Sequence, residues 1–226
     1  MKPFEFAPSL NEITDRYPAS DQLLEALDTS GYSDRVAIAR QWLSEGVPSA
    51  FQHCPAVFES LRFWLALKLG VKAKEISLVG SARLGWSLAP RKMGKPFDRE
   101  SDLDLFVISQ SLFPLICEDF CRWNSDYVNG RISPENKNEA EYWRDNSRRG
   151  SGLIERGFMD AKLIPTRGGY DRQNIHNTMW ELVEKLKATV TEPKIRKASL
   201  RCYDSWTSFE DQISRTLKNA AQSRLN

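Results

Sequence analysis

The sequence lacks any apolar run of the length that a membrane-spanning helix requires. A spanning helix needs about 20 predominantly apolar residues, and the best candidate, residues 61–70, is interrupted by Arg62 and Lys68. The amino-terminal residues 1–5 also lack the apolar core of a secretory signal peptide. We therefore expect a soluble, intracellular protein, cytoplasmic in location and without a membrane partner.

Histidine and cysteine are scarce as well. The 226 residues include two histidines and four cysteines, and no two cysteines form a C-x-x-C pair. Neither a zinc site nor a disulfide framework is predicted from so few ligands with this spacing. His53 and His176 have no motif around them that would make either one a general base, so serine hydrolase chemistry is not indicated.

No single sign of charge dominates the chain. Lys and Arg number 32 against 30 Asp and Glu, a net charge of +2, which excludes a chain-wide polycation. Hydrophobic residues make up 41% and argue against wholesale disorder. The first 60 residues carry a net charge of −5, and the remainder carry +7. This asymmetry indicates either an anionic substrate on the later part or a solvated acidic surface at the start, and charge alone favours the second.

The first 70 residues have a helical pattern. Helices are expected over residues 21–28, 34–45 and 55–69, and the residues at their starts are Ser20, Ser33 and Pro55. Gly70 supplies the stop for the third helix. We interpret residues 1–70 as a helical segment packed on the core and residues 71–226 as the main domain.

Strand and helix patterns alternate after residue 75. Short strands are expected over residues 76–79, 103–108, 158–164 and 198–203, and helices over 112–127, over 171–189 and near the carboxy terminus. The polar residues 129–152 are expected to form a loop or a surface helix, with a mobile lid as one role. This order of elements predicts an α/β or α+β fold with helical flanks.

One segment combines a sharp turn with paired carboxylates. Gly80 and Ser81 follow the first strand, and Asp102 and Asp104 flank Leu103 on the second. Gly80 has no Cβ, so the turning backbone can approach an anion closely, and Ser81 adds a hydroxyl donor. Because strand side chains alternate, both aspartates are expected on one face. Such a pair repels unless a cation such as Mg²⁺ lies between its members, and a phosphate cradle beside it is typical of phosphoryl or nucleotidyl transfer.

This pattern resembles the nucleotidyltransferase superfamily of the DNA polymerase β type, whose mark is an apolar strand, Gly-Ser and then Asp-x-Asp on the next strand. The similarity covers residues 76–108 and extends weakly to residue 164. It implies a mixed β-sheet flanked by helices, with Gly80 and Ser81 holding a nucleoside triphosphate. Asp102 and Asp104 would bind Mg²⁺ or Mn²⁺. The resemblance extends to small bacterial nucleotidyltransferase-like proteins of antiphage defence and toxin–antitoxin systems.

The resemblance also implies a third carboxylate on a later strand. Asp160 is the candidate, as a metal ligand and as the group that activates the acceptor hydroxyl, with Glu155 as the fallback. Lys162 would share the face of Asp160, where it either binds the nucleotide or forms a salt bridge with Asp160 at a strand edge. Arg83 is expected to reach the phosphates from the helix that follows the Gly-Ser turn.

Twenty residues separate Ser81 from Asp102, more than in the compact form of the motif. The excess is polar and punctuated by Pro and Gly. It is either a loop over the triphosphate, with Arg91, Lys92 and Lys95 reaching the phosphates, or a solvated excursion. An insertion that displaced the second strand would remove the expected metal site.

Aromatic and basic residues provide a further candidate contact with nucleic acid. Trp86 and Trp143 are the candidates for base stacking, because each lies near basic or motif residues. Burial on helix faces is expected instead for Trp42, Trp64, Trp180 and Trp206. A basic cluster, which either tracks a polynucleotide backbone or forms a solvated edge strand, consists of Lys194, Arg196, Lys197 and Arg201. The edge strand is the favoured interpretation.

The sequence therefore leads to the expectation of a metal-dependent nucleotidyltransferase. It would move a nucleoside monophosphate from a triphosphate to an acceptor hydroxyl and release pyrophosphate. The acceptor is left open among a protein, an RNA end and another nucleotide, and a cognate protein partner is also left open. A catalytically silent nucleotide-binding regulatory protein of the same fold is the alternative. A nucleic-acid-binding module ranks third, because it rests on the basic carboxy-terminal half alone.

Overall fold

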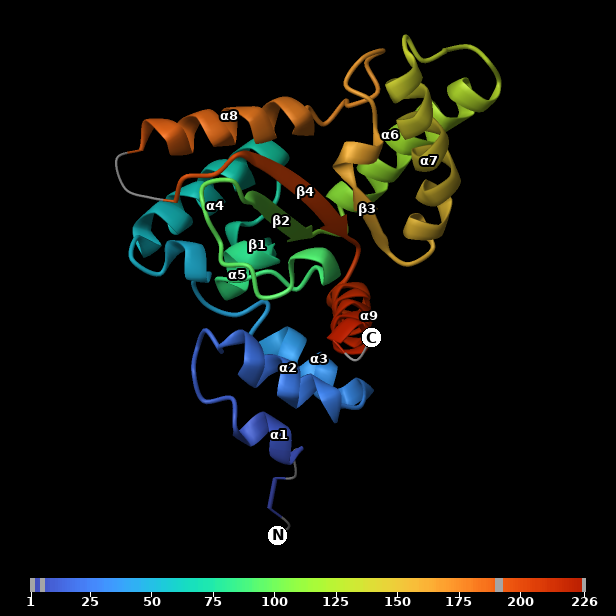
Figure 1. Cartoon of the computed structure of the whole chain (residues 1–226). Helices are drawn as coiled ribbons and strands as arrows, with labels where there is room; N and C mark the ends of the chain where they lie inside the picture. The colour runs from blue at the N-terminus through green and yellow to red at the C-terminus, as the bar shows by residue number, and fades with distance from the viewer. Residues whose placement is uncertain (1–2, 5–6, 190–192, 225–226) are drawn as a thin grey trace.

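The computed structural model describes residues 3–4, 7–189 and 193–224, which form helices around a small mixed sheet (Figure 1). Within these residues the sheet has four strands in the order β1-β2-β4-β3. The strands are β1 (Ile76–Val79), β2 (Asp102–Ile108), β3 (Phe158–Asp160) and β4 (Lys197–Tyr203). The two central strands, β2 and β4, are parallel, whereas each edge strand is antiparallel to its neighbour. The predicted α/β (α+β) fold class is confirmed.

Helices make up most of the remaining structure. The longer helices are α2 (Ser20–Asp28), α3 (Tyr32–Gln41), α4 (Pro55–Leu69), α6 (Leu112–Val128), α7 (Lys137–Ile154), α8 (Ile175–Ala188) and α9 (Trp206–Arg224). The short helical elements are α1 (Pro8–Asn11), α5 (Ser81–Leu84), η1 (Ser49–Phe51), η2 (Ala73–Glu75), η3 (Pro90–Lys92) and η4 (Ala161–Leu163). Across the described residues, no helix is both long enough and apolar enough to cross a bilayer. The prediction about a signal peptide concerns residues 1–5, of which 1–2 and 5 lie outside the described residues.

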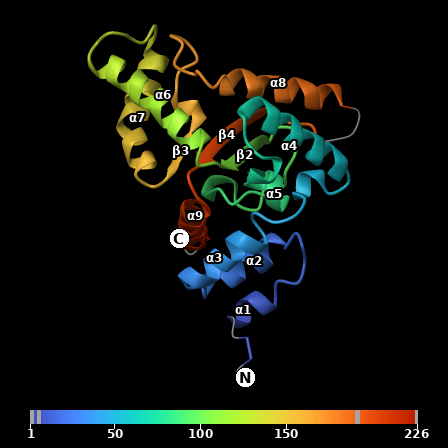
Figure 2. The same cartoon turned by 180° about the vertical axis from the view of Figure 1, so that it is seen from behind.

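The two faces of the sheet are covered by different helices. α4 and α8 lie across one face (Figure 2), and β2 buries Leu103 and Leu105 there. On the opposite face Phe106 stacks on Phe209 of α9, with 4.4 Å between the ring centroids. Because side chains alternate along β2, Asp102 and Asp104 share the face of Phe106. At their end of the strand that face opens into a cavity.

The first 70 residues contact both α9 and the sheet. α2 and α3 lie along α9, where Arg40 forms an ion pair with Glu210 at 2.6 Å. α4 instead covers the sheet, and it ends at Gly70, whose φ of +65° is the left-handed conformation that stops a helix. The amino-terminal segment is therefore helical, but its last helix belongs to the cover of the sheet.

α6 and α7 form a helical pair that stands beside β3 (Figure 1). Trp123 and Trp143 are buried between them with an edge-to-face contact, their ring centroids 5.7 Å apart. Gly150 lies directly against Phe120, since a Cβ at this glycine would come within 1.9 Å of the ring. Residues 129–152 thus form mostly a packed helix, and none of them lines the cavity. This packing argues against the expected lid.

Three predicted elements have an end that differs from the structure by more than one residue. The strand expected over residues 158–164 ends at Asp160, because the chain turns into η4 and the Ile164 N–H donates to the carbonyl of Ala161 at 3.0 Å. The helix expected over residues 34–45 is α3, which begins at Tyr32 and ends at Gln41. The helix expected over residues 171–189 is α8, which begins four residues later than predicted.

Candidate active site

The turn after β1 depends on glycine at position 80. Gly80 has φ +69° and ψ −150°, a conformation that other residues rarely adopt. The N–H groups of Arg83 and Leu84 donate to the Gly80 carbonyl at 3.1 and 3.2 Å, and this directs the chain into α5. A Cβ on Gly80 would lie 3.5 Å from Oδ2 of Asp104. The turn therefore runs immediately beside one of the two aspartates.

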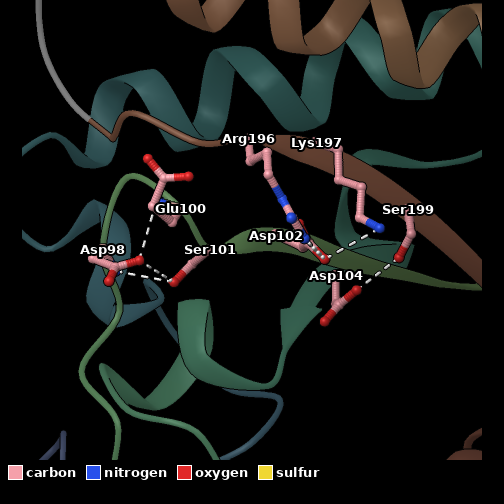
Figure 3. Close-up of polar contacts among 8 residues, drawn as sticks. All are labelled: Asp98, Glu100, Ser101, Asp102, Asp104, Arg196, Lys197 and Ser199. Carbon is pink, nitrogen blue, oxygen red and sulfur yellow. Dashed lines mark hydrogen bonds and ion pairs between the residues drawn. The ribbon is translucent and has the colours of Figure 1, made fainter. Parts of the chain in front are cut away.

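Strand pairing determines where the aspartates lie. Val79 pairs with Asp104 across β1 and β2, so the turn at Gly80 follows directly beside that carboxylate. The excursion between Ser81 and Asp102 does not displace β2, which pairs along the whole of β1. Asp102 and Asp104 project from one face of β2, as the sequence predicts (Figure 3).

β4 and the residue before it supply hydrogen-bond and ion-pair partners to both aspartates (Figure 3). Ser199 is the register partner of Asp104 and donates its hydroxyl to Oδ1 at 2.7 Å. Asp102 accepts from Nη2 of Arg196 at 3.1 Å and lies 3.5 Å from Nζ of Lys197. Lys197 and Arg201, two members of the basic cluster predicted as a solvated edge strand, thus lie on a central strand of the sheet. Two members of the cluster, Arg196 and Lys197, hold the Asp102 carboxylate.

The pKa of Asp104 is raised above its usual value. The enclosing protein is the main cause, since it disfavours the charged form, and the charge of Asp102 adds to the shift. The hydrogen bond from Ser199 and the charges of Lys162 and Arg201 act in the opposite direction. The side chain itself is open to the cavity. Two carboxylates that share one face of a strand and line one cavity are a donor set that suits a hard divalent cation.

Asp160 lies on the same side of the sheet but is held in a separate ion pair. It is 6% exposed. Arg201 donates a hydrogen bond from Nε to Oδ1 at 2.7 Å and another from Nη2 to Oδ2 at 3.0 Å. Burial would lower the pKa of Arg201, but its hydrogen bonds and ion pair with Asp160 raise that pKa above the usual range. The salt bridge considered from the sequence involved Lys162; the partner is Arg201, which faces Asp160 across β3 and β4.

The cavity has a volume of about 540 Å³. Its walls include six of the residues selected from the sequence, namely Gly80, Ser81, Asp102, Asp104, Asp160 and Lys162. The cationic side chains in its wall are Lys92, Lys95, Lys162, Arg196 and Arg201. Lys92 and Lys95 come from the excursion before β2, so that loop borders the cavity, whereas Arg91 does not line it. Glu155, the fallback carboxylate, also lies outside the lining.

Arg83 does not take the expected role. Its side chain is 1% exposed and donates to the carbonyls of Trp42 at 2.8 Å and Gly46 at 3.0 Å. Burial lowers the pKa of Arg83 to about 10. The guanidinium therefore ties α5 to the amino-terminal segment, and it does not line the cavity. The expectation that it contacts phosphates is incorrect for this arrangement, because the short α5 directs it toward the helical segment instead.

Comparison with known proteins adds no assignment. No family model, curated protein or solved structure significantly matches this chain.

Two carboxylates of the site, Asp102 and Asp104, are placed to act together as metal ligands. Within the part of the chain that the structure describes, no three His, Cys, Asp or Glu side chains come together as a metal-binding group. Asp102 and Asp104 suit Mg²⁺, which is usually bound by one or two carboxylates and completes its coordination with water and substrate phosphate oxygens. Asp160 could join them only if it left Arg201.

The tryptophans differ from the sequence expectation. Trp86 and Trp143, the candidates for base stacking, are buried, and Trp86 donates its Nε1–H to the carbonyl of Pro18 at 2.9 Å. Trp180 and Trp206, expected to be buried, are 63% and 46% exposed. On α8 the buried residues include Met179, Leu182 and Val183, whose helical spacing defines an apolar face that leaves Trp180 out. That spacing was the signal that could have identified Trp180 as a surface residue.

Proposed function

We propose that this protein is a metal-dependent nucleotidyltransferase. It would transfer a nucleoside monophosphate from a nucleoside triphosphate to a hydroxyl acceptor and release pyrophosphate. The observation that carries the proposal is the meeting of the Gly80–Ser81 turn with Asp102 and Asp104 in one cavity. A close-approach turn beside paired carboxylates matches the chemistry of a triphosphate with its metal ion. The cavity of about 540 Å³ also falls within the usual size of small-molecule sites.

Each group in the cavity has a role that follows from its chemistry. The turn at Gly80 lets main-chain N–H groups approach a phosphate, and Ser81 donates its hydroxyl. Lys92, Lys95 and Lys162, which also line the cavity, would balance phosphate charge. Asp102 and Asp104 would hold Mg²⁺ or Mn²⁺. When bound, the ion supplies charge neutralisation and Lewis-acid polarisation of phosphate oxygens.

The transfer makes one bond and breaks one. The acceptor oxygen bonds to the α-phosphorus, the bond from that phosphorus to its bridging oxygen breaks, and pyrophosphate leaves with the electron pair. The hydroxyl proton needs a carboxylate to receive it. We assign this role and that of third metal ligand to Asp160, and both require Arg201 to release its carboxylate when substrate binds.

A second candidate is a nucleotide-binding regulatory protein of the same fold without turnover. The bidentate Asp160–Arg201 pair favours it, because a carboxylate held this way is not free to bind a metal or a proton. The two candidates predict the same occupancy of the cavity and differ only in product.

A labelled-transfer assay separates the two candidates. Purified protein is incubated with each α-labelled nucleoside triphosphate, Mg²⁺ or Mn²⁺ and cell extract. Wild-type protein is expected to transfer label, with chelation of the metal abolishing transfer. Asp102→Asn/Asp104→Asn should lower transfer by about 100-fold or more, because the metal-binding groups lose their charge. Its melting temperature should stay unchanged or rise, because burial and then the charge of Asp102 both disfavour the charged form of Asp104.

Two matched controls accompany the assay. Asp145→Asn removes a carboxylate of α7 that pairs with Arg148 and Arg149 outside the cavity, and transfer should be unaffected.

Gly80→Ala should weaken triphosphate binding by at least about tenfold, because alanine is strained at a φ of +69°. Gly152→Ala, an open helical position in α7, should not. Triphosphate binding with no transfer to any acceptor would select the regulatory protein, and no binding at all would reject both candidates.

A further inference from the structure

A second hollow lies next to the cavity, between α8 and the beginning of β4. We propose that this groove binds the acceptor as a single-stranded polynucleotide; this inference rests on the proposed function and names its acceptor class. The groove has a volume of about 300 Å³. It shares three lining residues with the cavity, Lys162, Arg196 and Ser199, so the two hollows are contiguous.

The groove exists because β3 is short. β3 pairs with β4 only from Arg201 to Tyr203, and beyond Asp160 the chain leaves the sheet through η4. The first half of β4 therefore has β2 on one side and the groove on the other. α8 forms the opposite wall, with Met179 and Val183 contributing to an apolar floor.

The rim of the groove is strongly cationic. Its lysines and arginine are Lys162, Lys187, Arg196 and Lys197. Among the described residues of the lining, the single carboxylate is that of Glu184, which pairs with Lys187 at 2.8 Å. A surface with this excess of positive charge favours a polyanion, and phosphates spaced along a strand supply one.

Trp180 adds an aromatic surface to the same groove. It lies in the α8 wall with 63% of its surface exposed, which is unusual for a residue of this size. Exposed aromatic rings next to cationic side chains are the features with which single strands are bound, since bases stack on the ring while phosphates contact the cations. An acidic peptide would match the cations and leave the indole without a stacking partner, so the combination favours a polynucleotide.

The groove is also coupled to the carboxylates. Arg196 and Lys197 line the groove and hold Asp102 at 3.1 and 3.5 Å (Figure 3). A phosphate bound by these two cations lies beside the Asp102–Asp104 pair and competes for the side chains that neutralise Asp102. A strand in the groove would thus bring its terminal hydroxyl to the cavity, where that oxygen forms the new bond and pyrophosphate leaves.

The test measures binding by fluorescence anisotropy with a fluorescein-labelled single-stranded RNA of about 12 nucleotides, in the size range of single-strand sites. Trp180→Ala should weaken binding by about tenfold or more, because base stacking is lost. Lys187→Gln should weaken it and reduce the slope of log affinity against log salt by about 0.7, the value for one phosphate contact on a single strand. A single-stranded DNA of the same sequence tests dependence on the sugar, and a duplex should bind less tightly because its bases are stacked inside.

Matched controls remove equivalent groups elsewhere. Tyr142→Ala deletes a 69% exposed aromatic ring on α7, and Lys74→Gln deletes an exposed lysine of η2; both should bind RNA as wild type does. Melting temperatures establish that each variant is folded. Absence of RNA binding by wild type, or wild-type affinity in both groove variants, would overturn the proposal.

Failure of the groove and failure of the proposed function give different results. Asp102→Asn/Asp104→Asn should still bind the RNA, since the groove cations remain. RNA binding without label transfer would leave the groove standing and reject the transferase. Label transfer to a protein by an enzyme that does not bind RNA would reject the groove and retain the transferase.

Discussion

At the scale of single residues, the pair between Asp160 and Arg201 has the largest consequence for the site. Arg201 has 30% of its side chain exposed and Asp160 has 9%, and the two share two hydrogen bonds. The guanidinium also lies over the ring of Phe158, 4.7 Å from its centroid. A buried carboxylate with one cationic partner is stable only while that partner is present. The pair therefore fixes the position of the Asp160 carboxylate at the edge of the cavity.

Removing the cation should be more harmful than removing the pair. Arg201→Leu leaves a buried carboxylate without its partner and is expected to lower the free energy of unfolding by about 3 kcal/mol. Arg201→Leu/Asp160→Leu removes both charges, and its free energy of unfolding should fall clearly less than that of the single variant Arg201→Leu. Urea unfolding of wild type, both single variants and the double variant measures the coupling. If the loss of unfolding free energy in the double variant equals the sum of the losses in the two single variants, the pair does not act as a unit.

At the scale of elements, α8 is an example of a helix whose start is set by a side chain outside it. Asp171 accepts the N–H groups of Ile175 and His176, both at 2.9 Å, and its Oδ2 also lies 2.9 Å from Nδ1 of His176. Asn174, the residue directly before the helix, has φ +52° and provides no side-chain cap. Asp171 thus satisfies donors that the first turn leaves unpaired.

The charge of Asp171 gives this helix a pH dependence. Burial would raise the pKa of Asp171, but hydrogen bonds from the His176 side chain and from the backbone of Ile175 and His176 bring it below the usual 3.8. A carboxylate whose pKa is lowered by folding stabilises the folded state above the unfolded pKa, and this contribution is lost as the pH falls through the folded value. Asp171→Asn should therefore cost about 1 kcal/mol at neutral pH.

The measurement is chemical unfolding of wild type and Asp171→Asn over a series of pH values. The difference between the two should be constant from neutral pH down to the region of 3.8 and then shrink as the wild-type carboxylate is protonated. A difference that stays constant in strong acid would mean that the charge of Asp171 contributes nothing to α8.

At the scale of the whole molecule, α9 joins the amino-terminal helices to the sheet. Phe209 on one side of α9 packs on Phe106 of β2, while α2 and α3 lie along the helix. Two further links run from the amino-terminal segment to the neighbourhood of the site, through Arg83 to Trp42 and through Trp86 to Pro18. The segment is therefore part of the structure that holds the Gly80–Ser81 turn in place.

Deleting the first 47 residues should abolish cooperative folding. The deletion removes buried side chains that include Leu23, Leu24, Leu27 and Ile38. At about 2 kcal/mol for each side chain, these four contribute about 8 kcal/mol, which is comparable with the roughly 5–15 kcal/mol of total stability expected for a domain. Differential scanning calorimetry of residues 48–226 is expected to show no sharp transition. A transition within a few degrees of that of the full chain would contradict this view of the segment.

Local sequence patterns were sufficient to predict most elements and one part of the site. The spacing of Phe58, Leu61, Leu65 and Leu69 with Gly70 beyond them predicts α4 to the residue, because helix periodicity and a left-handed stop act locally. The alternation around Leu103 likewise predicts that both aspartates share a face. Each of these conclusions needs only neighbours in the chain.

The tertiary structure alone decided which distant residues meet. Parallel pairing of β2 with β4 sets Ser199 beside Asp104 and Arg196 near Asp102, across more than 90 positions of sequence. The register between β3 and β4 places Asp160 opposite Arg201, so Asp160 forms its ion pair with Arg201 and not with Lys162. Arg83 was expected to contact phosphates and instead binds backbone carbonyls of the amino-terminal segment. Local sequence does not determine where the amino-terminal helices pack. Side-chain periodicity is a property of one element, whereas pairing and packing depend on long-range contacts that form only when the whole chain folds.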